Sequence, residues 1–541
     1  MKIPFSLNIA VSILAAVFLV FLFSSLGFIF GLGINKLYIL FALAVTLLLQ
    51  FKYFQLDIKK NLFRLGIITV ITIGSAYISG QMTDFSYDGL WYHQTGILFL
   101  KKGWNPIYMS AVDFFRQHWE VDINGLIWID SYPKFYEIVA ANIYYLTGNI
   151  ETGHMLYFLS IVLLFCYSFF VFEQDLLKGR KKLSAFFSLL LVLNPIVIVQ
   201  MATYYVDGLV YIYFMVSLFA LVVISRQNTP NLLSYAMMIM SIIVLANLKH
   251  VGVAYAILEL LVFGFYLLIN RRHDSFFMKS CVVIVALFLL TAINPYFTNL
   301  YRGKHILYPV AGEGKIDIMS HNMPSSFRGR SMPYKLFMST FGRVGNAMSE
   351  YEVTDTKVKL KIPFTITISE IPFLARVDTR QSGFGVLWSG ILLISLFISF
   401  FIKETDIKDK KSYLLFQGIL ILSVLVNPEN WWARYVPQFY AVPIVVILFY
   451  LKSSFSSIRK TVSMVISAIV ISNSMITYAA IHETIVTFGE HKANFLQRLE
   501  LQREQFDVLR FYRGMKIPDN FTSPMLIFLD AQKDNEGKKH E

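Results

Sequence analysis

Charged residues and cysteines are scarce in this chain of 541 residues. Only 15% of the residues are charged, whereas soluble domains average about 25%. The chain therefore has too few charged residues to form the surface of a soluble protein of this length. Its two cysteines, Cys166 and Cys281, lie inside apolar blocks, which excludes a disulfide framework and a cysteine metal site. Internal repeats and the Gly-rich phosphate loop of nucleotide-binding proteins are also absent from the sequence, so an ATP-driven activity is not indicated.

Apolar residues, in contrast, make up 56% of the chain. They occur in nearly uncharged blocks of about 16 to 25 residues, a length that spans a bilayer core of about 30 Å. The sequence therefore predicts an all-α, polytopic membrane protein. We expect about thirteen spans, centred near Val20, Leu43, Ile71, Leu163, Leu191, Val216, Ile239, Leu260, Leu287, Leu393, Leu420, Val445 and Ile469.

The distribution of Lys and Arg predicts the orientation. With the N-terminus in the cytoplasm, the short inner loops carry basic clusters within residues 59–64, 178–182, 271–279, 403–411 and 452–460. The short outer loops carry only Lys36, Lys249 and Arg434. Because short cytoplasmic loops are enriched in Lys and Arg, we expect the N-terminus inside and the C-terminus outside a bacterial plasma membrane. The net charge of +13 is then explained by cytoplasmic loops and not by nucleic-acid binding.

Three regions are expected on the external face. A membrane domain over residues 1–480 contains external loops at 82–153 and 299–383, and residues 481–541 form an external tail or small domain. The apolar stretch 133–146 is short for a span, and counting it would turn every later basic loop outward. It is therefore predicted to be a helix at the membrane interface.

The start of the first external loop carries two acidic residues, Asp84 and Asp88. A carboxylate at the membrane surface, followed by an amphipathic helix, is placed where a general base could take a proton from an acceptor hydroxyl. Alternatively, Asp88 merely caps the helix that begins near Leu90. Other polar residues of this loop are expected to line the acceptor side of the site: Tyr92, His93, Tyr132 and Lys134.

Two further motifs lie at predicted outer span ends. Asp207 follows the fifth span and either belongs to the site or caps the sixth span. Lys249 and His250 lie at the turn between the seventh and eighth spans, and we expect them to bind the phosphate of the donor. A cation at this depth is a functional-site candidate, although a Lys near a span end can also reach the headgroups.

Basic residues on the outer side are candidates for binding a phosphate. Arg434 and Tyr435 precede the twelfth span, and a planar guanidinium suits bidentate contacts with phosphate oxygens. The alternative is an interfacial anchor beside the aromatic residues Trp431 and Trp432, which we expect in the membrane-interface belt. Lys304 and His305, in the second large loop, are further candidates for contacts with a donor phosphate or an acceptor.

In order, sidedness and spacing, these motifs resemble those of the GT-C superfamily of integral-membrane glycosyltransferases, which includes the protein O-mannosyltransferases and the aminoarabinose transferases of lipid A. Asp88, Tyr92 and Gly103 match the spacing of the family's catalytic Asp, Tyr and Gly-turn, which favours Asp88 over Asp84 as the base. The segments at Lys249 and Arg434 resemble family elements, the latter associated with the lipid phosphate. The sequence departs from the family at Gly89, where an acidic residue is common, and in having two spans before the one that carries the loop.

The resemblance implies a GT-C fold with juxtamembrane helices in the first large loop. It also implies transfer of a sugar from a polyprenyl-phosphate-linked donor to a glycan, lipid or protein acceptor. Asp207 resembles a second acidic residue that orients the acceptor or contributes to a metal site, so a divalent metal stays open and no other cofactor is expected. The alternatives are a surface-polysaccharide polymerase or ligase with a diphosphate-linked donor, and a membrane transporter or flippase.

Overall fold

The computed structural model describes residues 4–54, 58–119, 124–346, 358–403, 406–505 and 526–527. Within these ranges the chain is helical, with two isolated β-bridges (Gly342 to Leu360 and Gly345 to Gln381) and no strand. The predicted all-α class is therefore confirmed for the described part of the chain.

Six helical segments are long and apolar enough to cross a membrane, and a seventh is counted if a pair bent by 72° forms one span. The six lie in α1 (Phe5–Ile29), α3 (Ile58–Gly80), α8 (Met155–Val171) with its flanking turns, α11 (Asp207–Arg226), α13 (His250–Ile269) and α22 (Ser457–Gln505). The bent pair joins α14 (Ser275–Thr291) to α15 (Thr298–Tyr301) through the π-helical turn η4 (Ile293–Phe297).

The remaining helices are shorter or less apolar. Four of them are apolar over 10–17 residues: α2 (Lys36–Phe54), α12 (Leu232–Leu248), α19 (Trp388–Ser399) and α21 (Ala441–Ser453) with its preceding turn. The other α-helices are α4 (Gln94–Lys101), α5 (Ala111–His118), α6 (Leu126–Ser131), α7 (Phe135–Thr147), α9 (Lys181–Val192), α10 (Pro195–Gln200), α16 (Ile318–Asn322), α17 (Met332–Phe341), α18 (Ile371–Leu374) and α20 (Ile407–Leu425). Short π- and 3-10 turns complete the described elements: η1 (Gly89–His93), η2 (Ile150–His154), η3 (Phe172–Leu176), η5 (Ser325–Phe327), η6 (Ile368–Glu370), η7 (Ala433–Tyr435) and η8 (Pro437–Tyr440). Every one of the expected span centres lies in a helix, so the multi-pass character is supported, while the number of thirteen stays a prediction.

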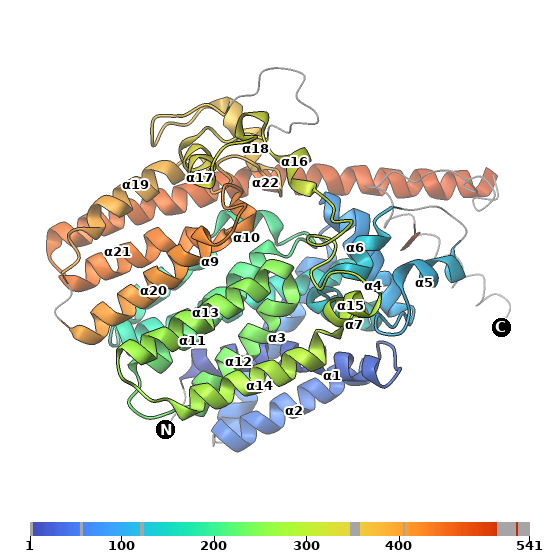
Figure 1. Cartoon of the computed structure of the whole chain (residues 1–541), viewed down its shortest axis with the longest axis horizontal. Helices are drawn as coiled ribbons and strands as arrows, with labels where there is room; N and C mark the ends of the chain where they lie inside the picture. Colours follow the sequence, from blue (N-terminus) through green and yellow to red (C-terminus); the bar gives the residue numbers. More distant parts are fainter. Residues whose placement is uncertain are drawn as a thin grey trace.

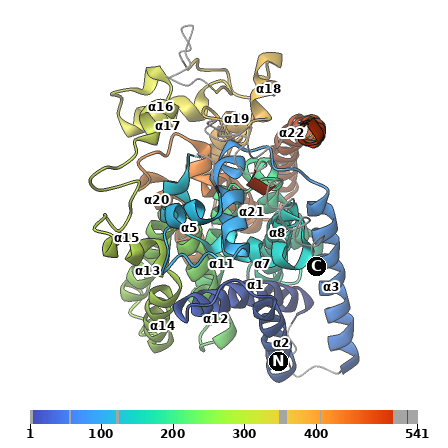
Figure 2. The ribbon, with the colours of Figure 1, turned by 90° about the vertical axis from the view of Figure 1, so that its right-hand side faces the viewer.

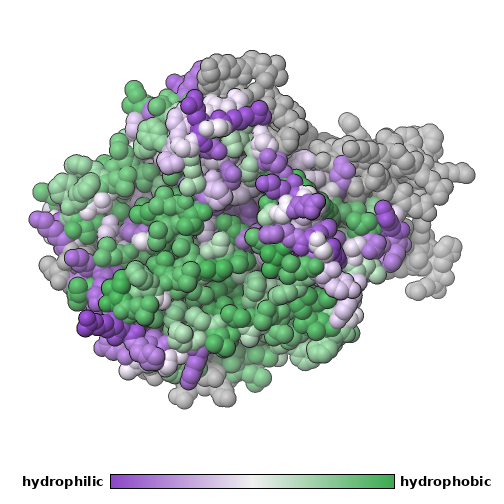
Figure 3. Space-filling view, in the orientation of Figure 1, coloured by the Kyte–Doolittle hydropathy of each residue, from purple (hydrophilic) through white to green (hydrophobic). Residues whose placement is uncertain are grey.

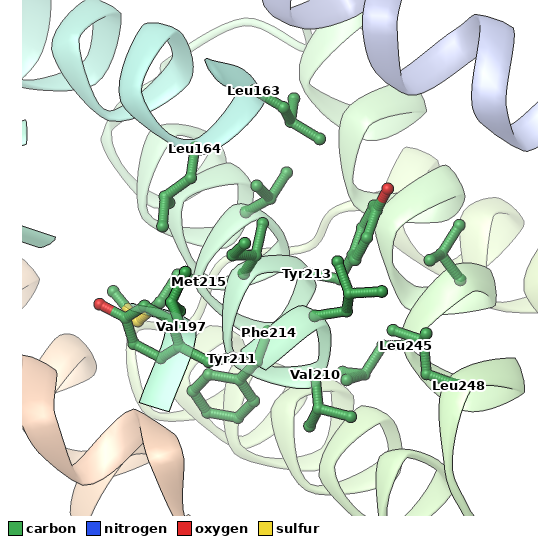
Figure 4. Close-up of a cluster of buried hydrophobic side chains, with 14 of the residues drawn as sticks. Leu163, Leu164, Val197, Val210, Tyr211, Tyr213, Phe214, Met215, Leu245 and Leu248 are labelled. Atoms are coloured by element: carbon green, nitrogen blue, oxygen red, sulfur yellow. The ribbon is translucent and has the colours of Figure 1, made fainter. Parts of the chain in front are cut away.

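Helix α11 is the centre of the bundle. Every residue from Asp207 to Ile224 is buried, as expected of a helix that is apolar on all sides. Figure 4 shows side chains of α11 packed between Leu163 and Leu164 of α8 and Leu245 of α12. This packing fixes the start of α11, and with it Asp207, in a rigid frame.

The outer surface of the bundle is apolar. Figure 3 shows a hydrophobic band crossing one face of the molecule, with hydrophilic residues gathered at the lower left, at the top and to the right of the centre. Helices α3, α13 and α14 expose large aliphatic and aromatic side chains to their surroundings. Such a band between two polar rims is what a bilayer requires of a protein surface.

The two large loops fold over one end of the bundle. Figure 2 shows α16–α18 of the second loop at the top, opposite the ends of α12 and α14 at the bottom. The stretch predicted as an interface helix forms α7, which is mostly buried and packs against α1, α2 and α4.

The chain beyond the last expected span continues as helix. Helix α22 extends over 49 residues to Gln505, about 74 Å at 1.5 Å per residue, and projects past the bundle (Figure 1). Residues 481–505 of the expected external tail thus belong to α22, because they are rich in Glu, Gln, Leu and Arg, which favour helix. Of the rest of that region, only residues 526–527 lie among the described residues.

Candidate active site

A cavity of about 1770 Å³ lies where the two large loops meet the ends of the helices. Its lining comes from the start of the first loop, the N-terminus of α11, the turn between α12 and α13, the second loop, and the segment before α21. Small-molecule sites usually measure about 300–1,000 Å³. This cavity therefore has room for two ligands or for a ligand with a long chain.

Most of the residues predicted from the sequence meet in this cavity. Nine of them line it: Asp88, Tyr92, His93, Tyr132, Asp207, Lys249, His250, Arg434 and Tyr435. Four do not: Asp84, Lys134, Lys304 and His305.

Asp88 lies at the cavity wall just before the turn η1. Its side chain makes no capping hydrogen bond to that turn, and its backbone is itself helical, so capping does not account for it. The side chain is 20% exposed, and Oδ2 lies 3.8 Å from Nη1 of Arg434. The carboxylate is thus accessible from the cavity beside one cation.

Asp84, the other acidic residue of the loop, is completely buried. Its Oδ1 accepts hydrogen bonds from the backbone N and the hydroxyl of Ser86 (2.7 and 2.6 Å), and its Oδ2 accepts one from the backbone N of Tyr204 (2.9 Å). Burial, and then the nearby charge of Glu151, raise the pKa of Asp84 to about 7. A Cβ on Gly89 would overlap the Asp84 carboxylate. Asp84 therefore links the loop to the segment that precedes α11 through hydrogen bonds, and it does not line the cavity.

Asp207 and Lys249 form an ion pair at the base of the cavity. Nζ of Lys249 donates to Oδ1 of Asp207, and Oδ2 accepts a hydrogen bond from Nε2 of Gln200 (3.1 Å). The side chains of Asp207 and Lys249 are only 2% and 12% exposed. The Lys249 ammonium also lies 4.1 Å from the ring centre of Tyr435. Lys249 thus turns inward and does not reach toward headgroups.

Arg434 lies between the two carboxylates. Its Nε is 4.0 Å from Oδ2 of Asp207, and its guanidinium lies over the rings of Trp432 and Tyr205 at 4.4 and 4.7 Å. Nε and Nη1 are buried and make no hydrogen bond to any described residue. Burial lowers the pKa of Arg434, but Tyr205 and the carboxylates outweigh burial and hold that pKa well above its ordinary value. A buried N–H without an acceptor is costly, so an anionic ligand oxygen would satisfy this guanidinium.

The aromatic pair Trp431 and Trp432 is buried, at 1% exposure each, which contradicts the expected place in an interfacial belt. The indole of Trp432 donates to the carbonyl oxygen of Asp378 (3.1 Å), and Trp431 stacks on Trp432. Both rings are covered because the second large loop folds over them.

The polar residues of the first loop form a second wall. Nδ1 of His93 lies 2.8 Å from Oε1 of Glu137, a buried contact that fixes the imidazole beside Tyr92 and Tyr132. Nε2 of His250 lies 3.1 Å from the carbonyl oxygen of Ser131. Aromatic surface interrupted by a few fixed polar groups is typical of a small-molecule site.

The other predicted contact residues lie elsewhere. Lys134 is buried and donates to the carbonyl oxygen of Tyr132, and burial lowers its pKa to about 8. The ammonium of Lys304 lies 4.4 Å from the ring centre of Tyr308, while Nδ1 of exposed His305 accepts from the backbone N of Leu307 (3.1 Å). Lys134 supports the first loop, and the positions of Lys304 and His305 do not support a donor-phosphate contact.

Arg380 also lines the cavity, and the sequence reasoning missed it. Its Nη2 donates to Oδ1 of Asn322 (2.6 Å) and lies 3.0 Å from Oδ2 of Asp378, while its Nε has no partner among the described residues. Its guanidinium lies 5.3 Å from the ring centre of Trp432, the ring that Arg434 also covers. The sequence feature that could have indicated Arg380 is the Asp378-Thr379-Arg380 segment, which lies shortly before an apolar block.

The described residues contain no group of three or more His, Cys, Asp or Glu side chains suited to a metal ion. Asp88 and Asp207 are instead both close to Arg434. No protein-family model matches the chain, and no curated protein matches it at a significant level.

Proposed function

We propose that the protein is a membrane glycosyltransferase that moves a sugar from a polyprenyl-phosphate-linked donor to a glycan, lipid or protein acceptor. The observation that carries the proposal is the accessible Asp88 carboxylate, which faces the partly unsatisfied Arg434 guanidinium in a large aromatic cavity at one end of an apolar bundle. A base and an anion-binding cation in one cavity are what such a transfer needs.

In the proposed reaction, Asp88 takes the proton of an acceptor hydroxyl as the hydroxyl oxygen attacks the anomeric carbon. The bond to the phosphate oxygen breaks with inversion, and the polyprenyl phosphate leaves with its negative charge. Nε and Nη1 of Arg434, which make no hydrogen bond to a described residue, donate to the phosphate oxygens and stabilise that charge. Because Lys249 is already neutralised by Asp207, we assign Lys249 to holding Asp207 and not to the phosphate.

A diphosphate-linked donor, as used by polysaccharide polymerases and ligases, is the second candidate. Arg380 favours it, because two guanidiniums beside Trp432 offer a contact for each of two phosphate groups. A transporter is the third alternative. Glu259, buried in α13 and hydrogen-bonded to Ser217 (2.5 Å), is the kind of intramembrane acid that transporters use, but it does not line the cavity.

The test uses purified protein in liposomes with a panel of polyprenyl-phosphate and polyprenyl-diphosphate sugars. We expect transfer from at least one monophosphate donor, and loss of that transfer in Asp88→Asn. Transfer from diphosphate donors alone would favour the second candidate. Flux of a sugar lipid across the bilayer without glycosyl transfer would refute the enzyme proposal.

A further inference from the structure

Residues 358–370 of the second large loop carry an apolar residue at every second position from Val358 to Ile368. The segment is not a regular strand, because residues 363–364 form a turn with Phe364 at a φ of +68° and residues 368–370 form the 3-10 turn η6. Most of its apolar side chains nevertheless face outward: Ile362 is 75% exposed and Ile368 is 91% exposed. Leu360, Phe364 and Ile366 are exposed as well, and we call residues 360–368 the apolar strip.

A buried ion pair lies beneath this segment. Nζ of Lys361 lies 2.8 Å from Oε1 of Glu370, and their side chains are only 3% and 2% exposed. Glu370 also accepts hydrogen bonds from the backbone N of Val344 (2.9 Å) and of Thr367 (3.0 Å). An ion pair inside and isoleucines outside is the reverse of what water favours for a surface loop. The segment is therefore built to present its apolar side to a non-aqueous partner.

The position of the apolar strip identifies that partner. A Cβ on Gly390 would overlap the ring of Phe364, so this ring lies directly on the first turn of α19. Helix α19 is apolar and exposes Leu393 and Phe397 along its length. In Figure 1 the second-loop helix α18 lies above and to the right of α19, and in Figure 3 hydrophobic side chains cover much of the left part of the surface, where α19 lies. The apolar strip thus continues the lipid-facing surface of α19 beyond the end of that helix.

We propose that residues 360–368 insert into the bilayer leaflet that α19 enters. Ile368, at the end of the strip, lines the cavity together with Ile371 and Pro372. The insertion places this rim of the cavity at the membrane. A lipid-linked donor then reaches Arg434 while its hydrocarbon chain stays in the bilayer. This consequence rests on the proposed function.

The test places single probes in the full-length protein. Cys166→Ser and Cys281→Ser remove the two native cysteines, and Ile362→Cys or Ile366→Cys then takes an environment-sensitive fluorophore. Arg328→Cys, at an exposed polar position of the same loop, is the matched control. The labelled proteins are reconstituted into phosphatidylethanolamine/phosphatidylglycerol vesicles, with and without phospholipid that carries a nitroxide on its acyl chain.

We expect the lipid nitroxide to quench the probes at 362 and 366 at least threefold more strongly than the control probe, and aqueous iodide to show the opposite order. Strong iodide quenching at 362 and 366 would show that the strip faces water and would overturn the proposal. Protection from both quenchers would indicate a protein cover and would overturn it too. Lipid quenching in a protein without transferase activity would leave the membrane contact standing and refute only the proposed function.

A second variant connects the strip to the donor. Ile362→Asp should raise the KM for a polyprenyl-phosphate sugar at least fivefold while kcat stays within twofold, because the change affects access and not Asp88. Ile362→Leu should leave both constants unchanged. An equal fall of kcat in both variants would contradict a role in donor access.

Discussion

Replacing Asp88 by asparagine separates catalysis from structure most directly. Asparagine keeps the size of the side chain but cannot accept the acceptor's proton at neutral pH. Since Asp88 makes no capping hydrogen bond and is partly exposed, folding should not change. A positioned base contributes about 10²–10⁴ in rate, so we expect turnover to fall by two to four decades with a nearly unchanged melting temperature.

The assay is single-turnover transfer from a saturating lipid-linked donor, with the melting temperature followed in the same detergent. Asp84→Asn is the internal control. Both carboxylate oxygens of Asp84 accept hydrogen bonds from backbone N–H groups, one from Ser86 and one from Tyr204. The amide nitrogen of asparagine cannot accept, so at least one of these buried hydrogen bonds is lost. That loss costs about 1–3 kcal/mol of folding free energy and should not affect the chemical step directly.

The outcome decides between the two carboxylates. Near-normal turnover in Asp88→Asn would refute the general-base assignment. If Asp84→Asn were the inactive variant and Asp88→Asn the active one, the base would lie one helical turn earlier and the enzyme class could stand. If both kept their activity, Asp207 would be the next candidate, because it is the other carboxylate next to Arg434.

Three other predictions follow from the same geometry. Arg434→Lys should raise the donor requirement about ten- to a hundredfold, since a charge-assisted contact contributes about 1.5–3 kcal/mol and lysine lacks the planar fork; an unchanged donor titration would reduce Arg434 to a packing role. The folded-state pKa of Asp84 is about 7 against 3.8 ordinarily, so its contribution to stability is complete below pH 3.8 and is lost as the pH rises through 7. Melting temperatures between pH 4 and 8 should therefore fall more steeply in the wild type than in Asp84→Asn, and parallel curves would contradict this. A reporter active only outside the cytoplasm should work when fused after Lys134 or Glu541 and fail at Lys181; a cytoplasmic Glu541 fusion would contradict the proposed orientation.

The sequence alone predicted that Asp88, Asp207 and Arg434 lie on the same side of the membrane. Each lies where an apolar block begins or ends, and the positive-inside rule assigns all three to one side of the membrane. Residues at span ends on the same side are confined to one face, so their convergence in a cavity needs no knowledge of the loops.

Residues within the long second loop could not be placed in this way. The long loop is not confined to one span end, so Arg380 in the cavity and Lys304 outside it could not be told apart. Trp432 was misassigned for the same reason, because the loop that covers it is distant in sequence. The lengths of the helices were not predicted from the apolar blocks either: α9 and α19 have only 12 residues each, whereas a helix that spans a bilayer needs about 20.

The close approach of Asp84 to Gly89 has a consequence for the evolution of this loop. In the superfamily that the sequence resembles, position 89 commonly holds an acidic residue, whereas here the Asp84 carboxylate fills the space that a side chain at 89 would enter. A side chain at position 89 and the Asp84 carboxylate thus cannot both occupy this small volume. We expect the two positions to exchange as a pair: Gly89→Asp should disrupt folding alone and be tolerated together with Asp84→Gly. A search for distant relatives should accordingly accept an acid at 84 or at 89, a degeneracy that a fixed two-acid motif would overlook.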